Sequence, residues 1–184
     1  TDAEELNLDG ARVFFGGHPL RDRIGAVINL EARGGGGRAL MFETGRGDAE
    51  TVARYAALAP RVSGGVNGNS LAVFVYSLMP NGTDFTIARN RNVPGMNFAF
   101  LGRPAHYHAA ESTPESLDQG ALQHMGEQAL EGAALMVADL PSARPSDAVF
   151  ADVFGRVVLH HAPAFGWVLL ALALAFGLAV AWRT

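Results

Sequence analysis

Four acidic or imidazole side chains stand out in this 184-residue sequence as candidates to bind a divalent metal ion or transfer a proton: Glu4, Glu5, Glu31 and His108. Glu31 ends the apolar run VINLEA, and His108 follows the run GMNFAFL by a short loop. Carboxylates and an imidazole at such boundaries suit an ion such as Zn²⁺. Because adjacent side chains diverge, one glutamate of the pair can bind metal while the other acts as general base toward water. This combination is typical of hydrolysis.

Each of these residues also has a structural explanation. Carboxylates in the first turn of a helix are favoured by the helix dipole, so the pair Glu4 and Glu5 alone favours a structural role. A glutamate at a strand end often marks where the chain meets water, and a histidine near a loop usually lies at the surface. The spacing alone leaves both interpretations open, and only the combination of all four residues favours a metal site.

The elements that would position these residues alternate between strand and helix. Apolar runs predict strands at residues 24–30, 39–42 and 95–101, while helical spacing covers residues 5–15, 48–58 and a long helix from Ser112 to about Ala138. Residues 70–78 fit either a strand or a short helix. This order predicts an α/β fold with a mixed, mostly parallel sheet flanked by helices. In such sheets, sites gather at the carboxyl ends of strands.

The composition excludes several classes of protein. Hydrophobic residues make up 49% and charged residues 17% of the chain, which excludes a disordered polypeptide. The formal charge of −4 gives no electrostatic reason to expect a nucleic-acid partner. The absence of cysteine excludes disulfides, thiolate zinc sites and a cysteine nucleophile.

One segment near the end of the sequence predicts a transmembrane helix. Residues 164–182 contain no charged side chain, and as a helix they would rise about 28 Å, close to the thickness of the bilayer's hydrocarbon core. Trp167 and Trp182 lie near the two ends of this segment, and Arg183 follows it. A buried helix of a soluble core is the alternative. Arg183 favours a cytoplasmic C-terminal end, which would place the preceding domain outside the cytoplasm, in a periplasm or lumen.

Three stretches resemble a known family. TDAEELNLDGARVFF resembles the D-G-E-E-x-G-L-x-G-A segment of the di-zinc aminopeptidases that include bacterial leucine aminopeptidase. GAVINLEARGGGGRALMFETG resembles the N-L-E-A-x-G-x-G-G stretch of their membrane-bound subgroup, the endoplasmic-reticulum metallopeptidases and vacuolar membrane proteases. The block that begins PNGTDF and includes GMNFAF and HYHAAESTPE resembles a third motif of that subgroup. The resemblance covers residues 1 to about 138, with the motifs in family order.

The resemblance implies a role for each candidate residue. Glu4 matches the general base, and Glu5 matches a ligand of one zinc ion. Glu31 matches the acidic ligand of the other zinc ion. His108 matches the imidazole that shares a zinc ion with Glu5, and it fits the motif better than His106. The complete site would hold two Zn²⁺ ions and act on a peptide or protein substrate.

Further positions follow less directly from the resemblance. Asp84 and Phe85 match a TDF element to which we assign a structural role. We expect the strand around Asn97 to line the pocket for the substrate's N-terminal side chain, through Met96, Phe98, Phe100 and Tyr107. The sequence departs from the family after His108, where Ala109, Glu111 and Ser112 stand in place of Thr and Asp-Thr.

The resemblance also implies that part of the site lies elsewhere. The family's other two ligands, a His and an Asp that bridges both metals, lie upstream of the acidic pair, and this sequence starts immediately before that pair. We therefore expect residues 1–140 to be the C-terminal portion of a zinc peptidase domain, 141–161 a linker and membrane-proximal segment, and 162–183 a transmembrane helix.

These expectations define the predicted function. It is zinc-dependent peptide hydrolysis, of the aminopeptidase kind, by an integral-membrane metallopeptidase of which this chain is a fragment, inactive alone. The alternative is a non-catalytic membrane-anchored scaffold or receptor domain with the same fold. A third interpretation, glutaminyl cyclisation, would use one zinc ion.

Other features have simpler interpretations. The glycines at 34–37 lack the Lys and Ser/Thr of a phosphate-binding loop and predict a tight turn. Asn81-Gly82-Thr83 is formally a glycosylation sequon, but a turn explains it. We expect the remaining histidines to lie at the surface or in interfaces, namely His18, His124, His160 and His161.

Overall fold

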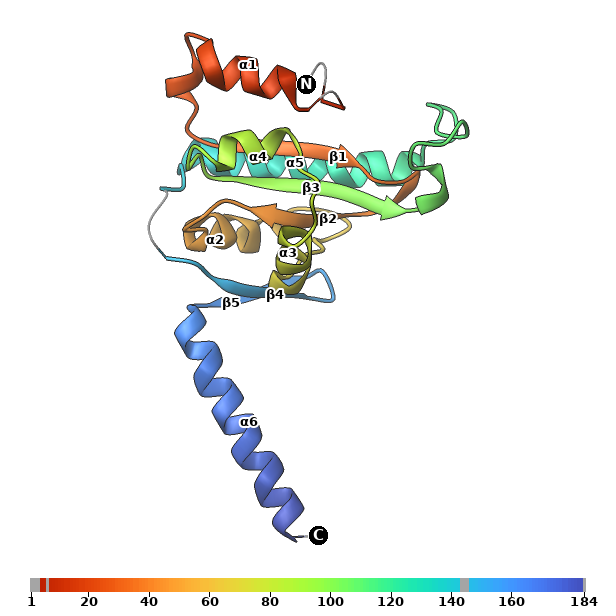
Figure 1. Cartoon of the computed structure of the whole chain (residues 1–184). Helices are drawn as coiled ribbons and strands as arrows, with labels where there is room; N and C mark the ends of the chain where they lie inside the picture. Colours follow the sequence, from red (N-terminus) through yellow and green to blue (C-terminus); the bar gives the residue numbers. More distant parts are fainter. Residues whose placement is uncertain (1–3, 6, 143–145, 184) are drawn as a thin grey trace.

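The computed structural model describes residues 4–5, 7–142 and 146–183. Its centre is a sheet of β1 (Val27–Ala32), β2 (Gly36–Thr44) and β3 (Gly95–Gly102), in the order β1-β3-β2 (Figure 1). β1 runs parallel to β3, whereas β2 is antiparallel to it. The predicted α/β class, with helices flanking a mixed sheet, is confirmed.

One face of the sheet forms the main hydrophobic core. The long helix α5 (Gln119–Ala138) covers this face, and α2 (Ala49–Leu58) packs beside it. Met96, Phe98 and Phe100 of β3 alternate along the strand and are buried here with Met41 of β2. Alternate residues of a strand point to opposite faces, so the residues between them belong to the other face.

The second face of the sheet carries shorter helices. α3 (Ser70–Ser77) lies against β2, and α4 (Asp84–Arg89) contacts β1 and β3. α1 (Asp9–Gly17) packs on α4, where Phe15, Phe85 and Ala88 form a smaller buried cluster. The short 3₁₀ helices η1 (Arg21–Arg23) and η2 (Pro104–His106) complete the connections.

Local capping explains where several helices begin. Residues 70–78, which fitted either strand or helix, start a helix because the Asn69 side chain accepts a hydrogen bond from the Ala72 amide at 2.9 Å. The long helix begins at Gln119, later than expected, because Asp118 caps it by accepting from the Ala121 amide at 3.1 Å. The expected start at Ser112 is wrong, since the Ser116 hydroxyl accepts from the Thr113 amide and closes a separate turn.

The structure corrects the expected surface position of His124. This side chain is buried, with Nδ1 accepting a hydrogen bond from the Ala39 amide at 3.0 Å. Its Nε2 lies 2.8 Å from the Gly65 carbonyl oxygen, so Nε2 donates. The imidazole therefore connects α5 to β2 and to the loop after α2, and periodicity alone did not reveal this role.

The segment before the apolar helix is folded. β4 (Val149–Val153) and β5 (Val157–His161) form an antiparallel hairpin whose Phe150 and Val158 enter the main core. Residues 149–161 are thus more than the connection that we expected between domain and helix, because two of their apolar side chains are buried. Residues 143–145 of the expected linker lie outside the described residues.

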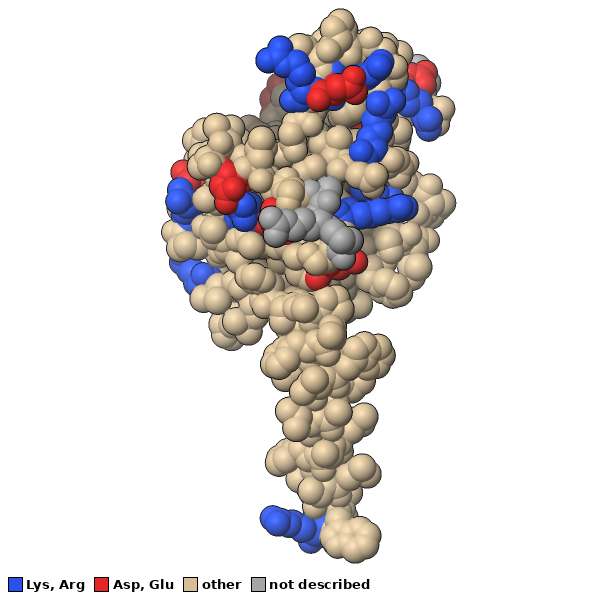
Figure 2. Space-filling view, turned by 90° about the vertical axis from the view of Figure 1, so that its left-hand side faces the viewer, with Lys and Arg blue, Asp and Glu red and all other residues tan. Residues whose placement is uncertain are grey.

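The final helix stands apart from the domain. α6 (Pro163–Arg183) projects from the end of the hairpin, and none of its side chains is buried (Figure 1). Within the described part of the chain it is the one helix long and apolar enough to cross a membrane. In space-filling view it forms a stalk without charged side chains along most of its length, while charged side chains are scattered over the face of the domain that is in view (Figure 2).

Candidate active site

Glu31 lies near the carboxyl end of β1, on the sheet face opposite α5. The carboxylate is half-buried, and its Oε1 accepts a hydrogen bond from Asn29 Nδ2 at 2.8 Å. The two side chains share a face because they are two residues apart on one strand. The end of β1 therefore presents a carboxylate whose orientation is set by a neighbouring amide.

Asn97 of β3 extends this arrangement into the interior. Its Oδ1 accepts from Asn29 Nδ2 at 3.0 Å, and its Nδ2 donates to Glu43 Oε2 at 2.9 Å. Nδ2 also donates to the Thr83 hydroxyl at 2.8 Å. Arg89 from α4 lies 2.9 Å from Glu43 Oε1 and compensates its buried charge. Sequence reasoning missed this network, and its only signal was polar residues within apolar strands.

Glu5 and His108 meet although they are 103 residues apart in the sequence. The distance between Glu5 Oε1 and His108 Nε2 is 3.1 Å. Two donor atoms bound at 2.0–2.1 Å to one tetrahedral zinc ion would be about 3.3 Å apart, so this pair fits two ligands of one ion. His106 instead packs against Gly35.

A polar cavity of about 290 Å³ unites the acidic residues. Glu4, Glu5 and Glu31 line it together with Tyr107 of the loop that carries His108. The other lining residues are Asn7, Leu8, Ala32, Arg33, Asn81 and Gly82. Within the described residues, no group of three or more His, Asp or Glu side chains is arranged so that it could hold a metal ion.

The electrostatic environment of this cavity raises the pKa of two carboxyl groups. Burial is the largest cause for Glu4, followed by the negative charges of Glu5 and Asp84. Burial is also the largest cause for Glu31, where Glu4 and Asp84 act in the same direction and the hydrogen bond from Asn29 opposes them. A concentration of carboxylates of this kind favours the binding of cations.

Arg33 lines the polar cavity and contacts the loop that carries His108. Its Nη1 donates to the Tyr107 hydroxyl at 2.8 Å, and its guanidinium carbon lies 5.4 Å from the centre of the Tyr107 ring. The charge of Arg33 lowers the pKa of both Glu4 and Glu31 and so partly offsets their repulsion. Tyr107 thus lies at the rim of the cavity, held by a cation.

The residues of β3 that we expected to line the substrate pocket lie on the face of the strand that points into the core, away from both cavities. Met96, Phe98 and Phe100 are buried in the core against α5 and line neither cavity. The intervening residues Ala99 and Leu101 instead line an apolar cavity of about 550 Å³ between the sheet and α3. A shift of one residue reverses the face of every strand side chain, and the sequence could not tell which face α5 would cover.

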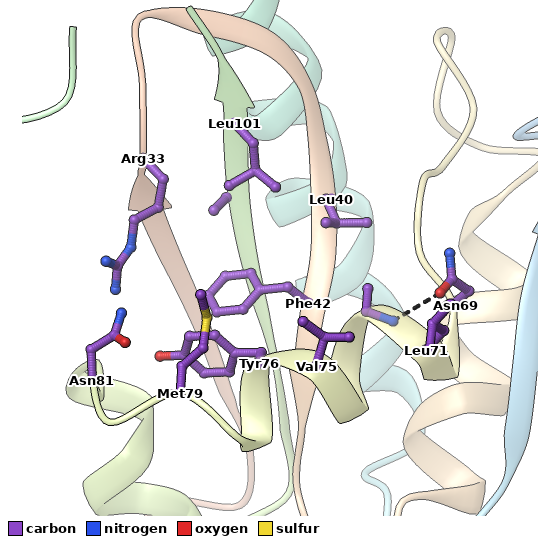
Figure 3. A pocket seen from close by; sticks show the side chains of 12 residues that line it. Arg33, Leu40, Phe42, Asn69, Leu71, Val75, Tyr76, Met79, Asn81 and Leu101 are labelled. Carbon is purple, nitrogen blue, oxygen red and sulfur yellow. Dashed lines mark hydrogen bonds between the residues drawn. The ribbon is translucent and has the colours of Figure 1, made fainter. Parts of the chain in front are cut away.

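This apolar cavity adjoins the polar one. Arg33 and Asn81 line both, and in close view they lie side by side at one end of the apolar cavity (Figure 3). Besides Ala99 and Leu101 of β3, most of the wall consists of apolar and aromatic side chains from β2, α3 and the segment after α3, among them Leu40, Phe42, Leu71, Val75, Tyr76 and Met79. The polar cavity with its carboxylates therefore lies directly beside the apolar cavity.

Comparison with known proteins identifies the class to which this site belongs. Residues 1–133 match the family described as Peptidase family M28. The chain belongs to this family, and the resemblance of its motifs to the membrane-bound subgroup is confirmed. No solved structure matches the chain.

Similar proteins come from animals and fungi. The chain is 31% identical over 173 residues to endoplasmic reticulum metallopeptidase 1 of Homo sapiens, which covers 91% of this chain and 19% of that protein. It is 34% identical over 176 residues to the vacuolar membrane protease of Eremothecium gossypii, covering 93% of this chain and 17% of that protein. The chain thus spans less than a fifth of the length of these relatives.

Proposed function

We propose that this chain supplies part of the two-zinc site of a membrane-anchored peptidase. The observation that carries the proposal is the convergence of Glu5 and His108, at 3.1 Å, beside a cavity lined by Glu4 and Glu31. Carboxylates that come together from distant parts of the sequence repel one another, and this repulsion is unfavourable unless a cation is bound between them. Family membership supports zinc as that cation.

The proposed ligands divide into two sets. Glu5 and His108 hold one zinc ion, and their donor atoms already have the required separation. Glu31 holds the other, with its carboxylate oriented by Asn29. When bound, zinc polarises the scissile carbonyl and makes water more acidic. A histidine and a bridging aspartate from the rest of the protein complete the set.

Glu4 acts as the general base. Its neighbour Glu5 is a ligand, and the two side chains diverge, so Glu4 remains able to take a proton from the attacking water. Burial raises its pKa toward the range in which a carboxylate both accepts and returns a proton. Glu4 then delivers this proton to the leaving amine.

The apolar cavity accommodates an apolar side chain of the substrate. It adjoins the acidic cavity through Arg33 and Asn81, and aromatic and aliphatic residues form its wall (Figure 3). The carboxylates of the polar cavity favour a positively charged substrate terminus, which supports aminopeptidase activity over internal cleavage. The substrate is therefore a peptide with an apolar residue at its N-terminus.

The chain's membrane anchor is α6, which spans the bilayer with Arg183 at the cytoplasmic end. This orientation places the peptidase site outside the cytoplasm, in a lumen or periplasm. The chain alone is inactive, because it lacks the bridging aspartate and the second histidine that the family uses.

To test this function, the variants Glu4→Gln and Glu5→Gln of the full-length protein are compared with the wild type. The turnover of an aminoacyl-amide substrate and the zinc content are measured for each protein. We expect Glu4→Gln to lose at least about a hundredfold in kcat with zinc retained. Glu5→Gln should lose zinc as well as activity. The exposed Glu115→Gln is the matched control and should match the wild type. Wild-type turnover by Glu4→Gln would show that the base is assigned incorrectly.

A non-catalytic scaffold is the rival function. The observation that favours it is that the described side chains alone form no cluster of three metal ligands. The residues upstream of Glu4 in the full-length protein discriminate between the two functions. A histidine and a bridging aspartate there support the enzyme, and their replacement supports the scaffold. A stoichiometry of one zinc ion per protein would support glutaminyl cyclisation instead.

A further inference from the structure

The hairpin β4–β5 has one buried and one exposed apolar face. The buried face packs against the domain, where the Phe150 and Tyr55 rings are 5.8 Å apart. The opposite face is formed by the cross-strand pairs Val153–Val157, Ala151–Leu159 and Val149–His161. The structure describes this hairpin completely, and its exposed face carries no Asp, Glu, Lys or Arg.

The tip of the hairpin extends this apolar surface. Phe154 is 93% exposed, and its φ of 51° lies in the left-handed region. A hairpin turn with two positive-φ residues ordinarily takes Asn or Gly at this position, and phenylalanine there costs backbone strain. A large apolar side chain is thus held in water at a conformational cost, which is unexpected unless the ring contacts something.

The position of this face in the molecule shows what it meets. Only Ala162 separates the end of β5 at His161 from the start of α6 at Pro163. In Figure 1 the hairpin lies across the base of the domain, with α2 and α3 above it and α6 leaving on the opposite side. The exposed face therefore looks toward the side on which the membrane helix departs.

We propose that the outer face of this hairpin lies on the lipid bilayer and inserts into its headgroup region. This surface, which consists of Phe154, Val157, Leu159, Val153 and Val149, is here called the membrane-facing surface. Apolar groups at the end of a membrane span gain free energy by leaving water at the interface. The surface fixes the domain against the membrane and limits its rotation about α6.

Charges near this surface agree with an interfacial position. Asp152 lies on the other face, where its carboxylate accepts from the Gly68 and Gly155 amides at 3.1 and 3.0 Å. Arg156 follows the tip and is exposed, so it is available to lipid phosphates. The hairpin thus keeps its acidic group away from the bilayer and leaves a basic group beside it.

The proposal rests on α6 spanning the bilayer and is independent of peptidase activity. Single cysteines at Phe154, Val157 or Leu159 in an otherwise cysteine-free full-length protein would carry an environment-sensitive fluorophore. The proteins are reconstituted in phosphatidylcholine vesicles with or without a mixture of lipids that carry a nitroxide either near the headgroup or in the acyl chain. Leu130→Cys, exposed on α5, is the aqueous control, and Leu172→Cys on α6 is the membrane control.

We expect the nitroxide lipid to remove roughly half of the fluorescence at the three hairpin positions and at Leu172, but not at Leu130. Aqueous iodide should quench only the label at Leu130. Hairpin labels that behave like the Leu130 label would overturn the proposal. Protection from both quenchers would overturn it too, because protein would then cover the face. Failure of the Leu172 label to respond would refute both this proposal and the membrane span, without bearing on the zinc site.

Discussion

Asn29 donates a 2.8 Å hydrogen bond to Glu31, two residues further along the same face of β1. The same amide group donates to Asn97 at 3.0 Å, which in turn binds the buried Glu43. A continuous chain of polar contacts therefore runs from the core of the sheet to a proposed zinc ligand. The packing of the sheet determines the orientation of that ligand, and the predictions below test this coupling.

Removing the Asn29 side chain should weaken the metal site while leaving the fold intact. We expect Asn29→Ala in the full-length protein to lower zinc affinity and kcat/KM about 10- to 100-fold, because Glu31 would no longer be held in one orientation. Zinc titration and steady-state kinetics measure both effects. Asn90→Ala, at the exposed end of α4, is the matched control. Unchanged zinc affinity in Asn29→Ala would show that Glu31 needs no orienting partner.

Asn97 should matter for stability as well as for the site. Its side chain is fully buried and bonds to Asn29, Glu43 and Thr83. Asn97→Leu removes one hydrogen bond from each of these groups, so the free energy of unfolding should fall by at least about 2 kcal/mol. Chemical denaturation of the protein in detergent micelles measures the change. A loss below about 0.5 kcal/mol would mean that water replaces the missing hydrogen bonds.

Glu43 should give an unusual pH dependence of stability. Burial raises its folded pKa above the ordinary 4.5, although the Asn97 hydrogen bond and the Arg89 charge oppose this. Its contribution to stability is therefore complete below pH 4.5 and is lost as the pH rises through the folded pKa, because the unfolded chain ionises first.

The corresponding measurement compares the wild type with Glu43→Gln in denaturation experiments from about pH 4 to about pH 8. Between pH 4.5 and the folded pKa of Glu43, the stability of the wild type relative to the variant should fall by at most about 1.4 kcal/mol per pH unit. Above the folded pKa it should stay constant. A relative stability that rises with pH would mean that Arg89 lowers the folded pKa of Glu43 below its ordinary value.

The two faces of β3 should respond differently to truncation. Phe98→Ala removes a ring that is fully buried against α5, so it should cost about 3–5 kcal/mol of stability. Leu101→Ala alters the wall of the apolar cavity and should raise KM for peptides with an apolar N-terminal residue, with stability nearly unchanged. Denaturation and kinetics on both variants test this division. If Phe98→Ala but not Leu101→Ala raised KM, the face of β3 that carries Phe98 would line the substrate pocket, as the sequence suggested.

His108 and His106 provide a matched pair in one loop. His108→Gln should remove one of the two zinc ions from the full-length protein and abolish activity, because the partner of Glu5 is lost. His106→Gln should retain both ions, since His106 packs against Gly35 instead. Metal analysis after dialysis gives the zinc stoichiometry. Retention of both ions by His108→Gln would assign the ligand elsewhere.

The sequence by itself determined the fold class, the family and the presence of a helix long and apolar enough to cross a membrane. Apolar runs and helical spacing are local properties, and they identified β1 and β3 within a few residues and α5 up to its C-terminal end, although they placed its start too early. The motifs around Glu4, Glu31 and His108 identified the family before any geometry was known. The charge-free stretch 164–182 likewise needed only its length and composition.

Only the tertiary structure decided which face of β3 meets the core and which side chains support the site. The alternation of Met96, Phe98 and Phe100 is compatible with either face, and the packing of α5 selected one. The links from Asn29 through Asn97 to Glu43, and the burial of His124, join positions far apart in the chain. Such contacts depend on strand order and register, because pairing distant segments is a global outcome that no local pattern encodes.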